Sequence, residues 1–280
     1  MTDLIIAIAL CVAVAIVYAT AALIQAGYAH LTIRECTRVP LWWVAQLLNV
    51  AGAGLHVVSL GFGPLSLIQP LGVLTLVIAM VFSATRARRR MTRLETIGLV
   101  STVAGLTGLA MLITTGGTPD TLSTGELTGL LLGGVVLVGL LAAKGAMAGS
   151  SALWEAAAGG IAYAICSALC QTFVVGLQTT GLSVLVTPFM LVAILAIGAF
   201  AVGGTVFTQR SYRDGLAAPL AVTNLVNPAS ATGIGVVFLG ESVATTPTEI
   251  VLAVVCGALA AYGVTSLAKA REAEPVLQRA

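Results

Sequence analysis

The chain has 280 residues, of which 58% are hydrophobic and 9% are charged, and its formal net charge is +2. Soluble domains carry about 25% charged residues, so this composition excludes a soluble protein. The small net charge also gives no basis for a nucleic-acid partner. The predicted class is an all-α integral membrane protein that has the lipid bilayer as a partner.

Apolar runs of roughly 20 residues recur along the sequence, and each can cross the ~30 Å hydrocarbon core of a bilayer as a helix. Nine spans are predicted, over residues 4–29, 40–61, 64–85, 92–114, 124–143, 152–178, 182–208, 214–239 and 246–268. The short connections leave no room for a soluble domain. The first span lacks a basic n-region and a small-residue cleavage site, so we expect it to be retained as a membrane helix.

The basic residues predict the orientation of these spans. All thirteen Lys and Arg residues follow the first, third, fifth, seventh or ninth span. Because Lys and Arg accumulate in cytoplasmic loops, the N-terminus is predicted to lie outside and the C-terminus in the cytoplasm. The densest group, Arg86 to Arg93, is interpreted as a determinant of this topology. The alternative is that it binds anionic lipid headgroups.

Polar side chains recur at helical spacing on four of the predicted spans. They are Tyr18, Gln25 and Tyr28 on the first span, Gln46, Asn49, His56 and Ser59 on the second, Tyr163, Ser167, Gln171 and Gln178 on the sixth, and Asn224 and Asn227 on the eighth. Residues at this spacing share a helix face, so together the stripes predict the lining of an aqueous path. For each residue alone, an interhelical hydrogen bond explains the pattern equally well.

His56 is the only ionisable side chain that the predicted spans place well inside the membrane. An imidazole with a pKa near 6.5 could relay protons there, or it could stay neutral and bond a neighbouring helix. Both interpretations of His56 stay open.

Two prolines stand beside amides within apolar spans, as Gln69–Pro70 and Asn227–Pro228. A proline frees a backbone carbonyl one turn earlier, and such a kink is tolerated at membrane depth where it faces protein or a wet cavity. Gln69 and Asn227 are therefore predicted to contact a solute at kinks made by Pro70 and Pro228. The alternative is that the prolines only shape their helices and the amides bond neighbouring helices.

The third and fourth spans can be aligned with the eighth and ninth. Three pairs of residues then match: Pro70 with Pro228, Gln69 with Asn227, and Glu95 with Glu249. Spans five positions apart cross the membrane in opposite directions, so these repeats would be inverted, as in alternating-access transporters. The predicted organisation is a first repeat of four helices over residues 1–114, a second repeat of five helices over 115–268, and a cytoplasmic tail over 269–280.

The absence of certain residue types from the predicted spans limits the solutes and reactions that the protein could serve. No carboxylate is predicted near mid-membrane, which argues against export of cationic drugs and, less strongly, against magnesium transport, since Mg²⁺ could pass largely hydrated between carbonyls and amides. Glu126 and Glu155 lie near helix ends and are expected to be wetted rather than buried. No catalytic motif is present, so neither an enzyme nor a cofactor is predicted. Cys166 and Cys170 share a helix face without a His or carboxylate, and we interpret them as small packing residues rather than metal ligands.

Two segments resemble a known family. The stretch WWVAQLLNVAGAGLHVVSLGFGPLSLIQPLGVL, from Trp42, is similar to NIPA-type magnesium transporters of the drug/metabolite transporter superfamily. The stretch APLAVTNLVNPASATGIGVVFLGE, from Ala218, resembles a helix of the EamA-type second repeat. The resemblance implies a ten-helix ancestor of five plus five helices, here with one fewer in the first half, and a bacterial inner-membrane location.

The expected function is secondary transport, by alternating access, of a small polar solute that is neutral or zwitterionic, or of a lipid-linked headgroup. One alternative is a NIPA-like Mg²⁺ transporter. Another is a non-transporting scaffold subunit of an envelope-building complex. Glycine patterns over Gly98 to Gly108 and Gly129 to Gly139 would allow close helix packing, either within one chain or in a homodimer.

Overall fold

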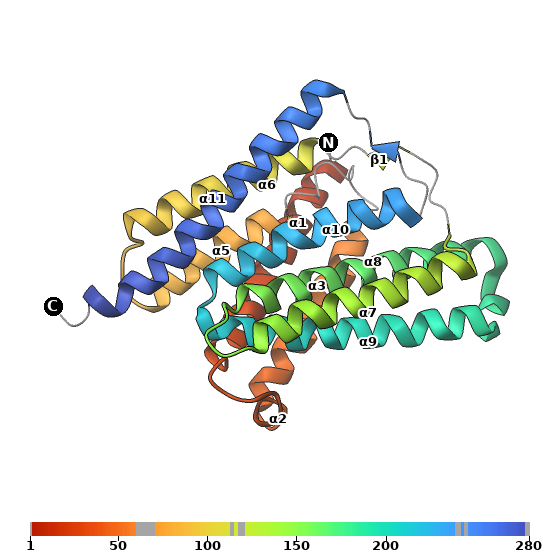
Figure 1. Cartoon of the computed structure of the whole chain (residues 1–280), viewed down its shortest axis with the longest axis horizontal. Coiled ribbons are helices and arrows are strands. Elements are labelled where there is room, and N and C mark those ends of the chain that lie inside the picture. Colours follow the sequence, from red (N-terminus) through yellow and green to blue (C-terminus); the bar gives the residue numbers. More distant parts are fainter. Residues whose placement is uncertain are drawn as a thin grey trace. The chain divides into compact units, whose positions relative to one another are not determined.

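A computed structural model of the chain describes residues 2–59, 71–112, 115–116, 121–238, 242–243 and 246–277. These residues are almost entirely helical (Figure 1). In chain order the elements are α1 (Thr2–Gly27), α2 (Ile33–Cys36), α3 (Pro40–Ser59), α5 (Leu71–Arg86), α6 (Arg93–Leu112), β1 (Thr115–Gly116), α7 (Thr124–Ala146), α8 (Leu153–Thr180), η1 (Gly181–Val186), α9 (Pro188–Ser211), η2 (Tyr212–Asp214), α10 (Ala217–Phe238), β2 (Ser242–Val243) and α11 (Pro247–Leu277).

Six helical segments in the described part of the chain are long and apolar enough to cross a membrane. They are Ala9–Gly27, Thr124–Ala146, Leu153–Val186, Pro188–Asp214, Ala217–Phe238 and Pro247–Ala270. The protein is therefore all-helical with the long apolar helices of a multi-pass membrane protein, as expected from composition. The remaining predicted spans overlap α3, α5 and α6, and a total of nine membrane crossings stays a prediction.

Local sequence explains where many helices begin and end. Three long helices, α3, α9 and α11, begin at a proline, which needs no N–H in the first turn. A capping box begins α2, where Thr32 donates to Glu35 from its backbone N–H and its hydroxyl, each at 2.8 Å. These hydrogen bonds hold the pKa of the Glu35 carboxyl below its usual range. Helix α8 ends at Gly181, whose φ of 72° suits a residue without a Cβ.

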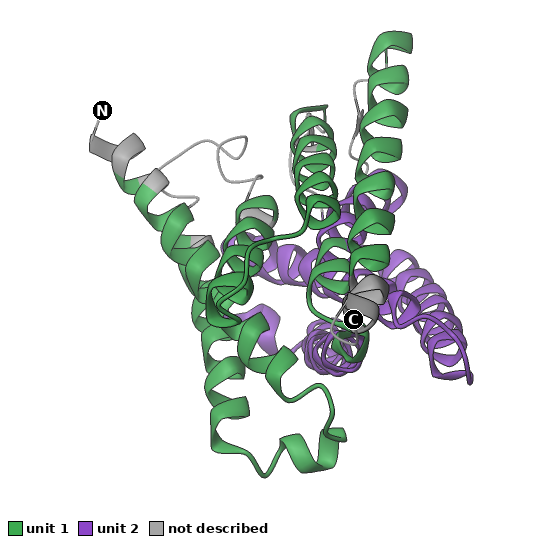
Figure 2. Cartoon of the chain, turned by 90° about the vertical axis from the view of Figure 1, so that its left-hand side faces the viewer, with its two compact units in different colours: residues 1–112, 212–221, 246–280 green, residues 113–211, 222–245 purple. Residues whose placement is uncertain are grey.

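The described helices form two compact units (Figure 2). Unit 1 contains residues 1–112, 212–221 and 246–280, and unit 2 contains residues 113–211 and 222–245. Helix α11 thus belongs with the N-terminal helices in unit 1, although the predicted second repeat, 115–268, groups most of it with α7 to α10. Helix α11 is placed in unit 1 because it packs against α6, not against the helices that precede it in the sequence.

In unit 1, α1 packs against both α3 and α5. Its side chains Cys11, Val14 and Ala15 are buried beside Leu55 of α3 and Leu74 of α5. Further along α1, the ring of Tyr18 covers Gly52 of α3, where a Cβ would lie 2.7 Å from Tyr18 Cε1. Tyr18, predicted as part of a polar stripe, therefore fills a helix–helix contact.

The second contact within unit 1 joins α6 and α11 in antiparallel orientation. Gly98 packs against Leu267, Gly105 against Ala260, and Gly108 against Cys256. A Cβ on Gly105 would lie 2.5 Å from the backbone N of Ala260, so the two backbones approach as closely as only glycine permits. The predicted small-residue face from Gly98 to Gly108 is thus used within the chain.

In unit 2, α8 packs against α7 and α9. The core is formed by the buried side chains of Leu130, Val138, Ile165, Leu169 and Phe200, among others. β1 pairs with β2 in antiparallel register, Thr115 opposite Val243. Helix α7 buries only a minority of its length, and its side chains Leu132, Val136 and Leu140 are exposed.

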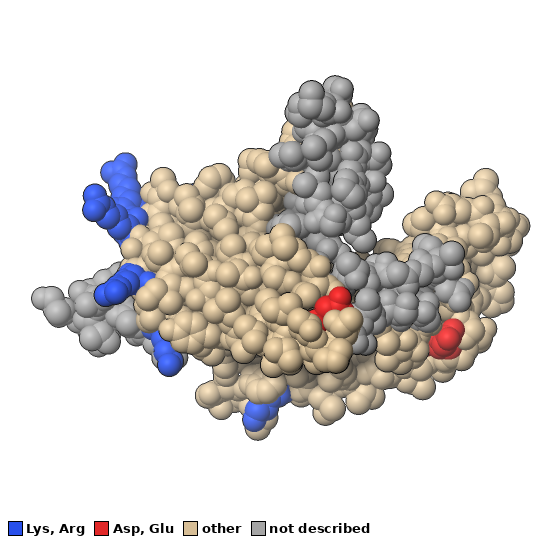
Figure 3. All heavy atoms as spheres, turned by 90° about the horizontal axis from the view of Figure 1, so that it is seen from above, with Lys and Arg blue, Asp and Glu red and all other residues tan. Residues whose placement is uncertain are grey.

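Charged side chains are sparse on the surface. In Figure 3, most of the described atoms belong to uncharged residues, and several Lys and Arg side chains gather at the edge where Figure 1 places the turn between α5 and α6. The exposed side chains elsewhere include many large aliphatic ones, such as Leu195, Val202 and Val254. Exposed apolar helix faces are what lipid contact requires.

Candidate functional site

Two predicted site residues, Tyr163 and Gln171, lie on α8 in unit 2. The Tyr163 hydroxyl lies 3.3 Å from Thr205 Oγ1 of α9, and its ring covers Gly204 of the same helix. Gln171 lies about two turns further along and is half-buried. Tyr163 therefore makes an interhelical hydrogen bond, the alternative that its spacing left open.

Two further predicted residues, Asn224 and Asn227, are half-buried on α10, while Pro228 is exposed. Pro228 lies inside the helix and has no N–H to donate to the carbonyl one turn earlier. The backbone of α10 approaches α8 at Gly160, where a Cβ would lie 3.3 Å from Asn227 N. Nearby, Thr223 Oγ1 donates to the Ala156 carbonyl at 3.2 Å. The structure thus places four predicted site residues on two helices that pack together. They are Tyr163 and Gln171 on α8, and Asn224 and Asn227 on α10.

The other predicted residues belong to unit 1. Gln25 of α1 is buried and Asn49 of α3 is half-buried. His56 lies in α3, but its side chain is outside what the structure describes. Gln69 and Pro70 also lie outside the described residues, so the predicted pairing of the two kinks is not tested.

A buried carboxylate appears where a wetted one was expected. Glu155, in the first turn of α8, has a fully buried side chain, and its Oε1 lies 2.8 Å from Arg210 Nε at the end of α9. It packs over Gly145 of α7, where a Cβ would lie 2.6 Å from Glu155 Cγ. The expectation for Glu155 was wrong because Gly145 leaves room for its side chain and Arg210 compensates its charge.

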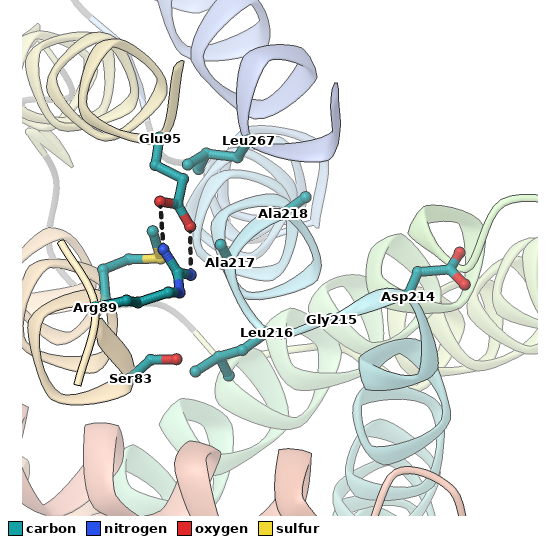
Figure 4. A pocket seen from close by; sticks show the side chains of 10 residues that line it. Ser83, Arg89, Glu95, Asp214, Gly215, Leu216, Ala217, Ala218 and Leu267 are labelled. Carbon is teal, nitrogen blue, oxygen red and sulfur yellow. Dashed lines mark hydrogen bonds and ion pairs between the residues drawn. The ribbon is translucent and has the colours of Figure 1, made fainter. Parts of the chain in front are cut away.

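A second ion pair stands at the wall of a pocket in unit 1 (Figure 4). Arg89 Nη1 and Nη2 donate to the two carboxylate oxygens of Glu95 at 2.8 and 2.7 Å, a bidentate arrangement. Glu95 also accepts from the backbone N–H of Thr92 at 2.7 Å. The pocket has a volume of about 70 Å³, and it is lined by Met80, Ser83, Arg89, Glu95, Leu267 and residues 214–218.

This pocket joins three segments that are far apart in the sequence. Arg89 follows the third predicted span, residues 214–218 begin the eighth, and Leu267 lies at the end of the ninth. The predicted topology requires all three segments to be cytoplasmic, and in unit 1 they lie at one end. Figure 4 shows the Asp214 carboxylate turned away from the Arg89–Glu95 pair.

Neither a family model, nor a curated protein, nor a solved structure matches the chain. The drug/metabolite transporter resemblance therefore stays a prediction from the sequence.

Among the described residues, no three His, Cys, Asp or Glu side chains are grouped closely enough to hold a metal ion. The Cys166 thiol donates to the Ile197 carbonyl of α9 at 3.7 Å, which is a packing contact between helices. One chemical feature missed by sequence reasoning is Glu155 itself. Its signal was the small-residue run Ala156 to Gly160, which lets neighbouring helices come close enough to bury the first turn of α8.

Proposed function

We propose that this protein is a secondary transporter that moves a small polar metabolite, neutral or zwitterionic, or a lipid-linked headgroup, across a membrane by alternating access. Three features support the proposal. They are the long apolar helices, the amides of α10 beside Pro228, and the antiparallel contact of α6 with α11. The third feature carries the proposal, because it bears on the inverted repeats that such transporters use.

The α6–α11 contact is centred on residues that correspond in the two predicted repeats. When Glu95 is aligned with Glu249, Gly105 is aligned with Leu259. Gly105 packs between Cys256 and Ala260, which lie on either side of Leu259. Equivalent positions meet in this way when a local two-fold axis between inverted copies passes through a helix pair.

The helix starts agree with this alignment. Thr92 N donates to Glu95 Oε2 at 2.7 Å, and Thr246 N donates to Glu249 Oε2 at 2.7 Å. Both boxes are closed by a return bond, from Glu95 N to Thr92 Oγ1 at 3.1 Å and from Glu249 N to Thr246 Oγ1 at 3.3 Å. Capping boxes also begin α2 and α7, so a box by itself does not indicate a repeat. The support comes from the matching positions of the boxes of α6 and α11 in the alignment.

The charges favour a solute without net charge. Glu155 is paired with Arg210 and Glu95 with Arg89, so each of these carboxylates is neutralised by its own arginine. A cation needs an uncompensated carboxylate to offset the loss of its hydration shell. Half-buried amides such as Asn224 and Asn227 instead suit a solute that is recognised by hydrogen bonds.

The test is uptake into proteoliposomes that contain the purified protein, measured with radiolabelled neutral and zwitterionic metabolites and, separately, with an internal Mg²⁺ indicator. The decisive variant is Asn227→Leu, for which we expect at least a tenfold loss of saturable uptake. Val237→Leu is the matched control, because Val237 is exposed on the same helix and should leave uptake unchanged.

Saturable uptake of a neutral or zwitterionic solute that depends on Asn227 would support the proposal. Saturable Mg²⁺ flux that is lost in Asn227→Leu would replace it with the magnesium-transporter alternative. A folded, correctly inserted protein that moves none of these solutes and purifies with a stoichiometric partner would favour a scaffold subunit instead.

A further inference from the structure

The turn between α5 and α6 carries a concentrated, uncompensated positive charge. Arg86, Arg88, Arg90 and Arg93 are all exposed, and no described carboxylate forms an ion pair with any of them. Only Arg89 of this group is neutralised, by Glu95. Four cations within eight residues therefore face solvent next to an apolar helix pair.

The turn is held in a defined conformation. The bidentate Arg89–Glu95 pair ties it to α6, and the side-chain exposure of these two residues is 32% and 12%. Thr92 caps α6 through Glu95, and Arg88 adopts a positive φ of 49° at the bend. Arg89 therefore fixes the turn, while its four neighbours remain free to bind a partner.

The pocket beside the turn has groups that suit a phosphate. Ser83 lines it, together with residues 215–218, which lead into and begin α10, and with Arg89, whose charge is already paired with Glu95 of the same lining (Figure 4). The first N–H groups of a helix attract anions. Asp214 also lines the pocket, but its carboxylate is turned away from Arg89 in Figure 4.

Apolar surface begins directly beside these cations. Val81 and Phe82 are exposed on α5 one turn before Arg86, and Ile97 and Val100 are exposed on α6 within two turns after Arg93. A free phosphate would use only the arginines and the pocket. A phospholipid would also place its acyl chains against these four side chains, and so bury apolar area.

We propose that the α5–α6 turn is a binding site for the headgroup of an anionic phospholipid, with its phosphate at the arginines and its acyl chains along α5 and α6. A role in topology alone needs only the number of positive charges in the loop. The lipid site also needs the fixed turn, the adjoining pocket and the exposed apolar side chains. It is independent of the transported solute.

The test uses the full chain in a neutral detergent, titrated with phosphatidylglycerol or with phosphatidylcholine of the same acyl chains. Bound lipids are counted by native mass spectrometry, and thermal unfolding is followed in parallel. Arg88→Gln/Arg90→Gln removes two cations of the site. Arg34→Gln/Arg38→Gln removes two exposed cations from the α1–α3 connection, and Arg88→Lys/Arg90→Lys keeps the charge at the site.

We expect the native chain to prefer phosphatidylglycerol and Arg88→Gln/Arg90→Gln to bind it about 30-fold more weakly, because each arginine contributes a factor of roughly five. The α1–α3 control and the lysine variant should keep the preference. Equal binding of both lipids by the native chain would overturn the proposal. An equal loss in Arg34→Gln/Arg38→Gln would also overturn it, since that result indicates diffuse attraction. Displacement of the lipid by inorganic phosphate at equal concentration would indicate a free-anion site instead.

Discussion

At the scale of single residues, the ion pair of Glu155 with Arg210 is one whose disruption should strongly lower the free energy of unfolding. The Glu155 side chain is fully buried, whereas that of Arg210 is 45% exposed. The attraction between two such charges roughly offsets the cost of removing the carboxylate from water, so the intact pair adds little net stability. Removal of one partner is different, because it leaves the buried charge uncompensated.

We therefore expect Arg210→Met to lower the free energy of unfolding by about 3 kcal/mol, the low end for broken buried pairs because Arg210 is partly exposed. The double variant Glu155→Gln/Arg210→Met should recover most of this loss, since no charge then remains buried. Chemical denaturation of the purified chain in detergent measures both. A single variant as stable as the parent chain would show that Glu155 does not depend on Arg210.

The residue scale is also where the sequence was least informative. Glu155 is expected to be wetted because it stands near a helix end, yet its burial depends on Gly145 of the preceding helix and on Arg210, which is distant in sequence. Tyr163 was expected at a site by its spacing, which does not distinguish a solute contact from its hydrogen bond to Thr205. Periodicity identifies a polar face but not what covers it.

At the scale of elements, two glycine-rich faces with similar patterns have different surroundings. On α6, Gly98, Gly105 and Gly108 all pack closely against α11. On α7, a Cβ on Gly133 or Gly139 would have no atom within 4 Å. Close packing of backbones needs both the glycines and an apposed helix of the same kind, and α11 supplies it with Ala260 and Gly263.

This contrast predicts opposite effects of one substitution. Gly105→Ala places a methyl group 2.5 Å from the backbone N of Ala260, so the helices must separate, at a cost of about 1–3 kcal/mol in unfolding free energy. Gly133→Ala adds the same methyl group in open space, where better helix propensity gives a change between zero and about 1 kcal/mol of stabilisation.

The unfolding temperatures of Gly105→Ala and Gly133→Ala, measured in the same detergent, test this prediction. If Gly133→Ala were as destabilising as Gly105→Ala, the open face of α7 would be occupied by a partner or by a second copy of the chain.

The helices themselves were largely predictable, because apolar runs about 20 residues long have few alternatives in a membrane. The predicted span 92–114 contains α6 entirely, and 124–143 differs from α7 only at its C-terminal end. The helix partners were not predictable. Nothing in the pattern from Gly98 to Gly108 specifies α11 rather than a neighbour in sequence, since many helices here are rich in glycine and alanine.

At the scale of the whole molecule, the predicted orientation assigns every connection between helices to one side of the membrane. In unit 2, Thr121 and Ser151 are exposed at opposite ends of α7, and Lys144 lies toward the Ser151 end. The distribution of basic residues puts Ser151 in the cytoplasm and Thr121 outside.

We expect a membrane-impermeant maleimide to label Thr121→Cys in intact cells, but to label Ser151→Cys only after permeabilisation. The background must first lack the native thiols, which are Cys11, Cys36, Cys166, Cys170 and Cys256. The reverse pattern would invert the topology, and labelling of both positions from outside would mean that α7 does not cross the membrane.

The partnership of α6 with α11 has a consequence for biogenesis. Ribosomes add about 5–20 residues per second, so α6 would wait on the order of ten seconds in the membrane while residues 113–246 are made. During that time its glycine face would be open to other proteins in the membrane. A nascent chain arrested before α11 would leave this face uncovered, because the partner that packs against Gly98, Gly105 and Gly108 would be missing.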